Sequence, residues 1–264
     1  MRTCRKNGTK QRNLGKRAWI WTIPMSAAVF LLIWSGVSRW SGLPAFMLPS
    51  PGQVWVRFLR AWEDGSLIYH TGVTLSEVAS GLFLGMFVAT ILGYLLAKSP
   101  AIEQILSPYI VASQAVPTVA IAPLLIIWFG PGHLSKILIS ALIVFFPILI
   151  NTIFGVRSVS DDLYDLMESL QATPWQIFSR LEVPAALPVI LGGLKIGATL
   201  SVIGAVVGEF IGSDEGLGFL INIGRGLYDT ALVFVAVATL VLMALALYGA
   251  VILIEHTALR WRTD

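Results

Sequence analysis

The segment VILGGLKIGATLSVIGAVVG, residues 189–208, sets the class of fold, because Lys195 is the only charged residue in it. A helix of about 20 apolar residues crosses a hydrocarbon core about 30 Å thick. Small residues recur at every fourth position of the segment, at Gly193, Gly197, Ser201 and Ala205. Such a ridge lets the backbone of a neighbouring helix approach closely. The segment therefore predicts a membrane-spanning helix that packs against other helices.

The rest of the chain has the same character. Of its 264 residues, 56% are hydrophobic and 12% are charged, whereas soluble domains carry about 25% charged residues. The alternating pattern of outer-membrane barrel strands is absent, so backbone groups inside the bilayer must be satisfied within helices. We predict an all-α bundle of six transmembrane helices. Besides residues 189–208, the predicted spans are residues 18–37, 78–97, 109–129, 137–156 and 231–254.

Basic residues indicate the orientation. Seven of the 18 Lys and Arg residues lie in the first 17 positions, and such segments stay on the cytoplasmic side of a membrane. We expect residues 1–17 to form a basic cytoplasmic tail, residues 18–264 to form the transmembrane domain, and both termini to lie inside the cell. The span at 18–37 is interpreted as an anchor, because no small-residue cleavage site follows it before Arg39. The tail is therefore a topology signal, and no nucleic-acid partner is expected.

The longest predicted cytoplasmic segment, residues 157–187, has the pattern of two short helices. Apolar side chains recur along the first at positions i, i+3, i+4 and i+7, at Leu163, Leu166, Met167 and Leu170. The second begins with Thr173, Pro174 and Gln176, a capping-box pattern, and is expected to end at Pro184. On the residues alone, this helix pair either covers the end of the bundle or docks on a partner.

The stretch DLMESLQATPWQIFSRLEVPAALP, residues 165–188, resembles the cytoplasmic EAA loop of binding-protein-dependent ABC import permeases. That family's pattern is Glu-Ala-Ala, three residues, Gly, nine residues, Ile, one residue and Leu-Pro. The chain fits this spacing without a gap and keeps the proline. A glutamine, Gln171, stands at the glycine position. This departure bears on the turn between the two helices, because glycine adopts a left-handed conformation more readily than glutamine does. The resemblance assigns an ATPase-coupling role to Leu163, Asp165, Leu166, Met167, Glu168, Leu170, Gln171, Ala172, Trp175, Leu181 and Pro184.

The resemblance covers about residues 48–259 and implies a type I ABC importer permease. It implies three partners besides the lipid bilayer: a pair of ABC ATPase subunits, an extracytoplasmic substrate-binding protein and a second permease chain, expected to form a homodimer with this one. No Gly-x-x-x-x-Gly-Lys-[Ser/Thr] motif occurs in the chain, so it has no P-loop for ATP phosphates. We therefore expect a non-enzymatic translocation subunit of the bacterial inner membrane that binds no cofactor, with ATP hydrolysed by the partner.

The cargo is narrowed by similarity. Residues 113–117, 145–148 and 198–209 are similar to the nitrate, sulfonate, taurine and thiamine-precursor permease group, and within it to permeases for riboflavin or hydroxymethylpyrimidine. Lys195 is the only charge inside the six predicted spans, which favours a neutral heteroaromatic cargo over an anion. Riboflavin or a thiamine pyrimidine precursor is the first hypothesis, and an alkanesulfonate, taurine or nitrate is the alternative.

Polar residues inside apolar segments are candidates for the substrate pathway. Glu209 continues the small-residue ridge near the end of its span, where it either gates the pathway, pairs with Arg225 or meets water. Gln114 and Asn151 either line the pathway or tie helices together. Phe145 is a candidate aromatic contact for a flat cargo.

Two other classes of protein compete with an importer. An ion-coupled secondary transporter is expected to show inverted repeats with broken helices at matching positions. An integral-membrane enzyme is expected to gather His, acidic, Ser or Cys side chains at one membrane face. Neither pattern is found in the sequence. His70, His133 and His256 are scattered and Cys4 is the only cysteine, so no metal site is expected.

Overall fold

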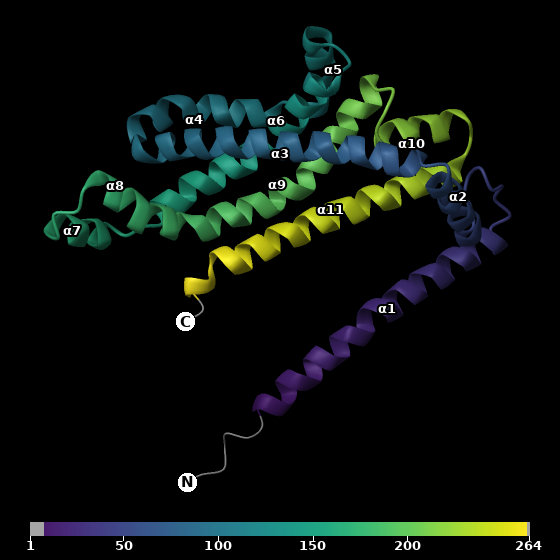
Figure 1. Cartoon of the computed structure of the whole chain (residues 1–264), viewed down its shortest axis with the longest axis horizontal. Coiled ribbons are helices and arrows are strands. Elements are labelled where there is room, and N and C mark those ends of the chain that lie inside the picture. The colour runs from purple at the N-terminus through teal and green to yellow at the C-terminus, as the bar shows by residue number, and fades with distance from the viewer. Residues whose placement is uncertain (1–7, 263–264) are drawn as a thin grey trace.

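The computed structural model describes residues 8–262 of the chain, and the side chains of residues 24–261. The described part is helical and contains no strand, which confirms the predicted all-α class (Figure 1). Its elements are α1 (Gly8–Trp40), α2 (Pro51–Glu63), α3 (Ser66–Lys98), α4 (Pro100–Ala115), α5 (Thr118–Phe129), α6 (His133–Arg157), α7 (Asp161–Ser169), α8 (Pro174–Ile177), a π-helical turn (Phe178–Glu182), α9 (Val183–Gly212), α10 (Leu217–Gly226), α11 (Thr230–Ala258) and a 3-10 turn (Arg260–Arg262).

Helix α6 is the centre of the bundle and packs along both α3 and α9. The small-residue ridges of α3 and α9 make this contact close. A Cβ atom on Gly85 of α3 would lie 2.7 Å from the carbonyl oxygen of Ala141, and one on Gly204 of α9 would lie 2.5 Å from Cα of Ser140. The Ser140 hydroxyl donates a hydrogen bond of 3.0 Å to the carbonyl of Ser201. The ridge predicted in residues 189–208 therefore packs within the chain, and Gly81, Gly85 and Gly93 form a matching ridge on α3.

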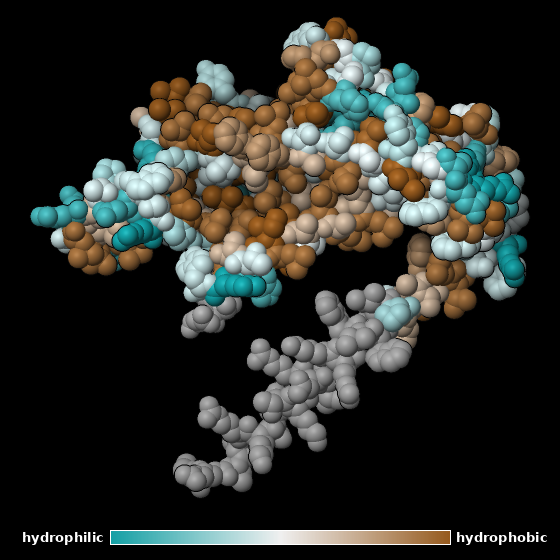
Figure 2. All heavy atoms as spheres, viewed as in Figure 1, coloured by the Kyte–Doolittle hydropathy of each residue, from teal (hydrophilic) through white to brown (hydrophobic). Residues whose placement is uncertain are grey.

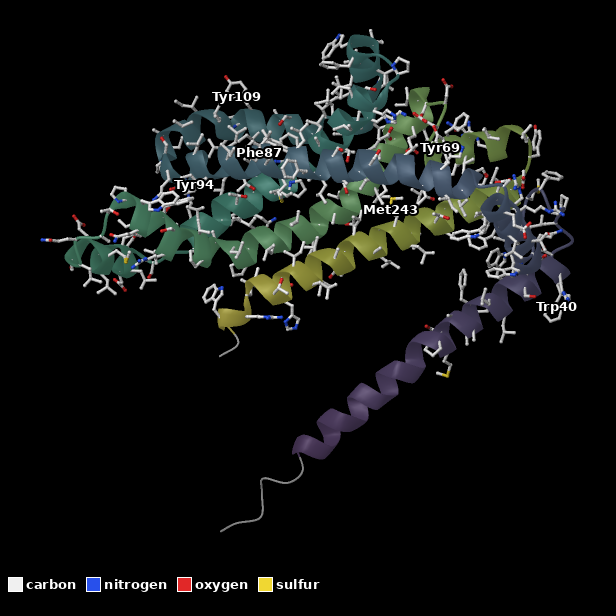
Figure 3. All side chains as sticks on the ribbon, in the orientation of Figure 1. Trp40, Tyr69, Phe87, Tyr94, Tyr109 and Met243 are labelled. Carbon is white, nitrogen blue, oxygen red and sulfur yellow. The ribbon has the colours of Figure 1, made fainter. Side chains whose placement is uncertain are left out.

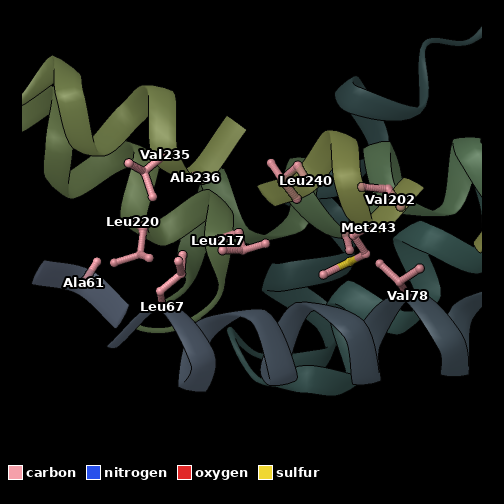
Figure 4. Close-up of a cluster of buried hydrophobic side chains, with 11 residues drawn as sticks. Ala61, Leu67, Val78, Val202, Leu217, Leu220, Val235, Ala236, Leu240 and Met243 are labelled. Carbon is pink, nitrogen blue, oxygen red and sulfur yellow. The ribbon is translucent and has the colours of Figure 1, made fainter. Parts of the chain in front are cut away.

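A buried hydrophobic cluster joins α2, α3, α9, α10 and α11 (Figure 4), and α2 and α10 lie at the end of the bundle away from α7 and α8 (Figure 1). Leu67 and Leu220 lie at one side of this cluster, Met243 of α11 lies at the other, and Leu217 lies between them (Figure 4). Helix α1 diverges from this body (Figure 1). Its Trp34 ring stacks on Phe234 of α11, with ring centroids 5.2 Å apart, and the Trp34 indole N–H donates to the carbonyl of Pro49, just before α2, at 3.1 Å. This cluster orients the loops at one end of the bundle.

Four helical segments are long and apolar enough to cross a membrane: α3, α6, the continuous run Pro174–Gly212 and α11. They contain four of the predicted spans, and each extends beyond the predicted ends. The predicted span 18–37 lies inside α1 and begins before residue 24, where the described side chains start, so it stays a prediction. Residues 8–17 of the predicted tail belong to α1, and residues 1–7 lie outside the described residues.

The predicted span 109–129 is wrong as a single helix. It includes the end of α4 and all of α5, which meet at an angle of 92°. Val116 takes an extended conformation, with φ −82° and ψ 118°, as expected of a residue before a proline. Pro117 lacks the N–H group that would continue the helix. Pro123 and Pro147 lie inside α5 and α6 without interrupting them.

A glycine pair in α9 tests the importance of the α6 contact. Gly204→Ala places a methyl group against the backbone at Ser140, and overpacking of this kind costs about 1–3 kcal/mol. Gly192→Ala is the matched control, because no atom lies within 4 Å of its added Cβ and alanine favours a helix by about 1 kcal/mol. We expect thermal unfolding in lipid nanodiscs to shift down for Gly204→Ala and to stay level or rise for Gly192→Ala. Equal shifts would contradict the packing argument.

Candidate functional site

Helices α7 and α8 extend beyond the bundle at the end opposite to α2 and α10 (Figure 1). The apolar face predicted for α7 is largely exposed in the chain, with Leu163 43% exposed, Leu166 53% and Leu170 68%, while Met167 is half-buried. Apolar atoms are visible on the surface of this tip (Figure 2). An amphipathic helix with an exposed apolar face is suited to docking in a groove of a partner.

The turn between α7 and α8 has the conformation that a glycine would favour. Gln171 has φ 54°, in the left-handed region that costs an L-residue about 1–2 kcal/mol. Two backbone bonds close the turn, from the Gln171 N–H to Glu168 and from the Ala172 N–H to Met167, at 2.8 and 2.9 Å. Thr173 then starts α8 with the predicted capping box. The glutamine therefore keeps the turn geometry at an energetic cost.

Pro184 does not end the second helix, contrary to the prediction. Helix α8 passes through the π-helical turn Phe178–Glu182 directly into α9, and the N–H of Val183 bonds to the carbonyl of Phe178. Pro184 lies in the first turn of α9, directly after the π-helical turn, and its missing N–H does not interrupt the helical run. The result is one helical rod of 39 residues, Pro174–Gly212. No break in the helical run separates α8 from α9.

Glu182 connects three elements at the base of this loop. Its carboxylate is 2% exposed and pairs with Lys98 of α3. It also accepts hydrogen bonds from the hydroxyl groups of Tyr94 in α3, at 2.8 Å, and Tyr164 in α7, at 3.0 Å. Figure 3 shows Tyr94 at the end of α3 nearest α8. Burial and then the bond to Glu182 raise the pKa of Tyr164, so the phenol stays a donor.

The other predicted coupling residues lie in the same loop. Trp175 is 71% exposed, and its ring centroid lies 5.4 Å from that of Phe178. Asp165 and Glu168 are exposed on α7, whereas Ala172 and Leu181 are half-buried. Sequence reasoning missed Glu182 itself, although a single acid between apolar residues at the start of a span was a usable signal.

The four predicted pathway residues do not meet at one site. Gln114 lines a cavity of about 320 Å³ beside the break between α4 and α5, together with Phe146. Phe145 instead packs against the buried cluster of α3, α6 and α9. Asn151 donates to the carbonyl of Pro147 at 2.8 Å, and its side chain would meet a Cβ placed on Gly193, so it fills the contact between α6 and α9.

Glu209 is buried, and neither the expected contact with Arg225 nor exposure to water is found among the described residues. It accepts hydrogen bonds from the hydroxyl of Thr74, at 2.6 Å, and from the N–H of Gly218. The glycine-rich segment after α9 folds back over this carboxyl group. Its surroundings lie far apart in the sequence, and no local pattern predicted them.

Residues 81–260 match the family model described as the binding-protein-dependent transport system inner membrane component. This match covers the close α3–α6–α9 contact, the α7–α8 loop and Glu182. The chain belongs to this family.

Individual relatives agree with that assignment. The chain is 48% identical to the riboflavin transport system permease protein of Chloroflexus aurantiacus, over 92% of this chain and 90% of that protein. It is 36% identical to the formylaminopyrimidine transport permease protein of Halalkalibacterium halodurans, over 89% and 93%. A permease chain from the inward-facing MetNI methionine ABC transporter has the same fold, with a TM-score of 0.64 at 18% identity, over 73% of this chain and 95% of that one.

Membership of this family establishes the general role of the protein. The protein is a multi-pass inner-membrane permease of ABC transport systems, a translocation subunit rather than an enzyme. ATP binding in such systems belongs to the ATPase partner. Among the described residues, no group of three or more His, Cys, Asp or Glu side chains is arranged to hold a metal ion.

The strained turn gives a direct test of the loop geometry. Gln171→Gly removes the left-handed penalty, and we expect slower hydrogen exchange at the Gln171 and Ala172 amides, by roughly fivefold for about 1 kcal/mol. Gln171→Ala is the matched control, because alanine keeps the penalty and should exchange as the wild type does. Faster exchange in the glycine variant would contradict the assigned conformation.

Proposed function

We propose that this permease imports riboflavin, in a complex driven by ATP hydrolysis and supplied by an extracytoplasmic binding protein. The observation that carries the proposal is 48% identity to a riboflavin permease over nearly the whole length of both chains. A thiamine pyrimidine precursor is the second candidate, favoured by the formylaminopyrimidine relative. Alkanesulfonate or taurine stands third, because the corresponding permeases of Bacillus subtilis and Escherichia coli are 33% and 32% identical.

The distribution of charged side chains near the spans favours a neutral cargo over an anion. The lysines in or beside the spans are each neutralised by a carboxylate: Lys98 by Glu182, Lys136 by Glu77 and Lys195 by Glu255. The side chains that line the cavity beside Gln114 carry no charge. An anion would enter this cavity without a compensating cation, which is unfavourable in a medium of low dielectric constant.

The loop suggests how ATP hydrolysis drives transport. We infer that the exposed face of α7, centred on Leu166, docks in a groove of each ATPase subunit. A displacement of the loop reaches α9 through the continuous helix and reaches α3 through Glu182. A homodimer would present two such loops to an ATPase pair, and closure of that pair would move the helices as rigid bodies.

Uptake by proteoliposomes tests the cargo and the coupling together. The permease is reconstituted with its ATPase pair and binding protein, and uptake of radiolabelled riboflavin and hydroxymethylpyrimidine is measured with and without ATP. We expect ATP-dependent riboflavin uptake. Leu166→Asp places a charge in the docking face and should weaken the ATPase contact by about 2 kcal/mol, or roughly thirtyfold, and abolish uptake.

Leu166→Met is the matched control, because it keeps an apolar side chain of similar size and should transport normally. Stimulation of the ATPase by a sulfonate-loaded binding protein, with no vitamin uptake, would replace the cargo and keep the importer. Uptake that is indifferent to ATP would contradict the importer itself.

The single cysteine tests the proposed orientation, with both termini in the cytoplasm. Cys4 is the only thiol in the chain, and a membrane-impermeant maleimide should label it in permeabilised cells but not in intact spheroplasts. In a Cys4→Ser background, Asp214→Cys, in the turn after α9, should label in intact spheroplasts. The reverse pattern would invert the topology.

A further inference from the structure

Helix α2 carries three sets of side chains, each at positions i, i+4 and i+7, and residues at this spacing share one face of a helix. The first set is apolar and packs into the buried cluster of Figure 4, the second is apolar and exposed, and the third is polar and borders a cavity. In this order, the sets are Val54, Phe58 and Ala61; Trp55, Leu59 and Trp62; and Gln53, Arg57 and Arg60. Helix α2 therefore has three different faces.

The second set forms the aromatic face of α2, and the rest of the chain does not cover it. Trp55, Leu59 and Trp62 are 60%, 40% and 55% exposed. The half-buried Phe58 supports both indole rings: Trp55 stacks on it with ring centroids 5.4 Å apart, and the Trp62 ring lies at 6.0 Å. The inner side of each indole ring is therefore packed, while the outer side needs a partner from outside the chain.

Contacts at both edges of α2 set its rotation about its own axis. At its start, the Ser50 N–H donates to Oε1 of Gln53 at 2.8 Å, and the Gln53 N–H donates to the Ser50 hydroxyl at 3.4 Å. Further along, Nε of Arg57 lies 2.7 Å from Oδ2 of Asp229, the residue before α11. The exposure of the aromatic face is therefore imposed by the fold.

Helix α2 lies at the level where the apolar part of α11 begins. It runs across the direction of α3 and α11 rather than along it (Figure 1). The apolar run of α11 starts at Ala231, two positions after the Asp229 that binds Arg57. Tyr228, one position before Asp229, is 74% exposed, and Tyr and Trp rings collect at the boundary between acyl chains and water. The aromatic face is therefore continuous with the surface that the spans present to lipid.

The polar face of α2 needs water. Gln53, Arg57 and Arg60 border a cavity of about 1070 Å³, whose lining includes Asp229. Two guanidinium groups and one carboxylate leave a net positive charge there, and charged groups are costly inside hydrocarbon. Helices that lie in a membrane surface combine Trp and Leu on one face with basic residues on another. Helix α2 has this combination.

We propose that α2 is an interfacial helix whose aromatic face binds the surface of the bilayer, with Trp55, Leu59 and Trp62 inserted among the phospholipids. Such helices bury their apolar face about 5–10 Å into the boundary between headgroups and acyl chains. The bilayer then supports α2 from one side, and the cavity bordered by Arg57 and Arg60 opens to water on the other. The inference depends on the membrane location of the family and not on the cargo.

Spin labels on α2 test this placement. In a Cys4→Ser background, Trp62→Cys and Trp55→Cys are each labelled with a nitroxide in the full-length permease, reconstituted with its ATPase pair in phospholipid nanodiscs. Oxygen concentrates among acyl chains, whereas a charge-neutral nickel chelate stays in water. We expect the ratio of oxygen to nickel collision rates, measured by power-saturation electron paramagnetic resonance, to be several-fold higher at both positions than in Arg60→Cys. This variant is the matched control, because Arg60 is exposed on the polar face of the same helix.

Two outcomes would overturn the proposal. A high nickel collision rate in Trp62→Cys and Trp55→Cys, equal to that in Arg60→Cys, would place the aromatic face in water. Low collision rates with both reagents would show that a second protein chain covers it. The two labelled tryptophan positions are independent, so the test holds if one variant fails to fold. No uptake is measured, so a negative result leaves the proposed cargo unaffected.

Discussion

The close approach of α3 and α9 to α6 is the constraint on which the rest of the molecule depends. Lipid tails are as apolar as leucine, so the hydrophobic effect does not drive helices together inside a bilayer. Backbone contact through Gly85 and Gly204 supplies dispersion and hydrogen bonding instead. It also fixes the relative height of the three helices. That register brings Glu182 to Lys98 at one end and Glu209 to Thr74 at the other.

The sequence predicted correctly those structural features that depend on residues close together in the chain. The apolar runs predicted four of the spans, the four-residue spacing of small side chains predicted which faces pack, and the capping box placed the start of α8. Pro117 and Pro184 show that a proline in the sequence does not by itself predict where a helix breaks. Both are prolines in helical surroundings, yet one breaks a span and the other lies in the first turn of one. The difference depends on which backbone donors neighbouring residues need, and that is a property of the folded chain.

Sequence reasoning failed most clearly for the polar clusters. Glu182 and Lys98 are 84 positions apart, and Thr74 and Glu209 are 135 positions apart. Each residue alone resembles an ordinary charge near the end of a span. Glu209 was a candidate because it continues a small-residue ridge, whereas Glu77, Lys136 and His133 gave no signal that they meet. Buried ion pairs between distant segments become visible only when the helices are placed side by side.

The 92° bend between α4 and α5 has a consequence for the lipid around the protein. A broken helix leaves backbone N–H and C=O groups without their partners one turn away. Hydrocarbon cannot satisfy such groups, and irregular backbone at membrane depth persists only where it is covered by protein or reached by solvent. The cavity beside Gln114 lies at this break. The bend therefore marks a place where protein or water, and not lipid, must satisfy the backbone of this segment.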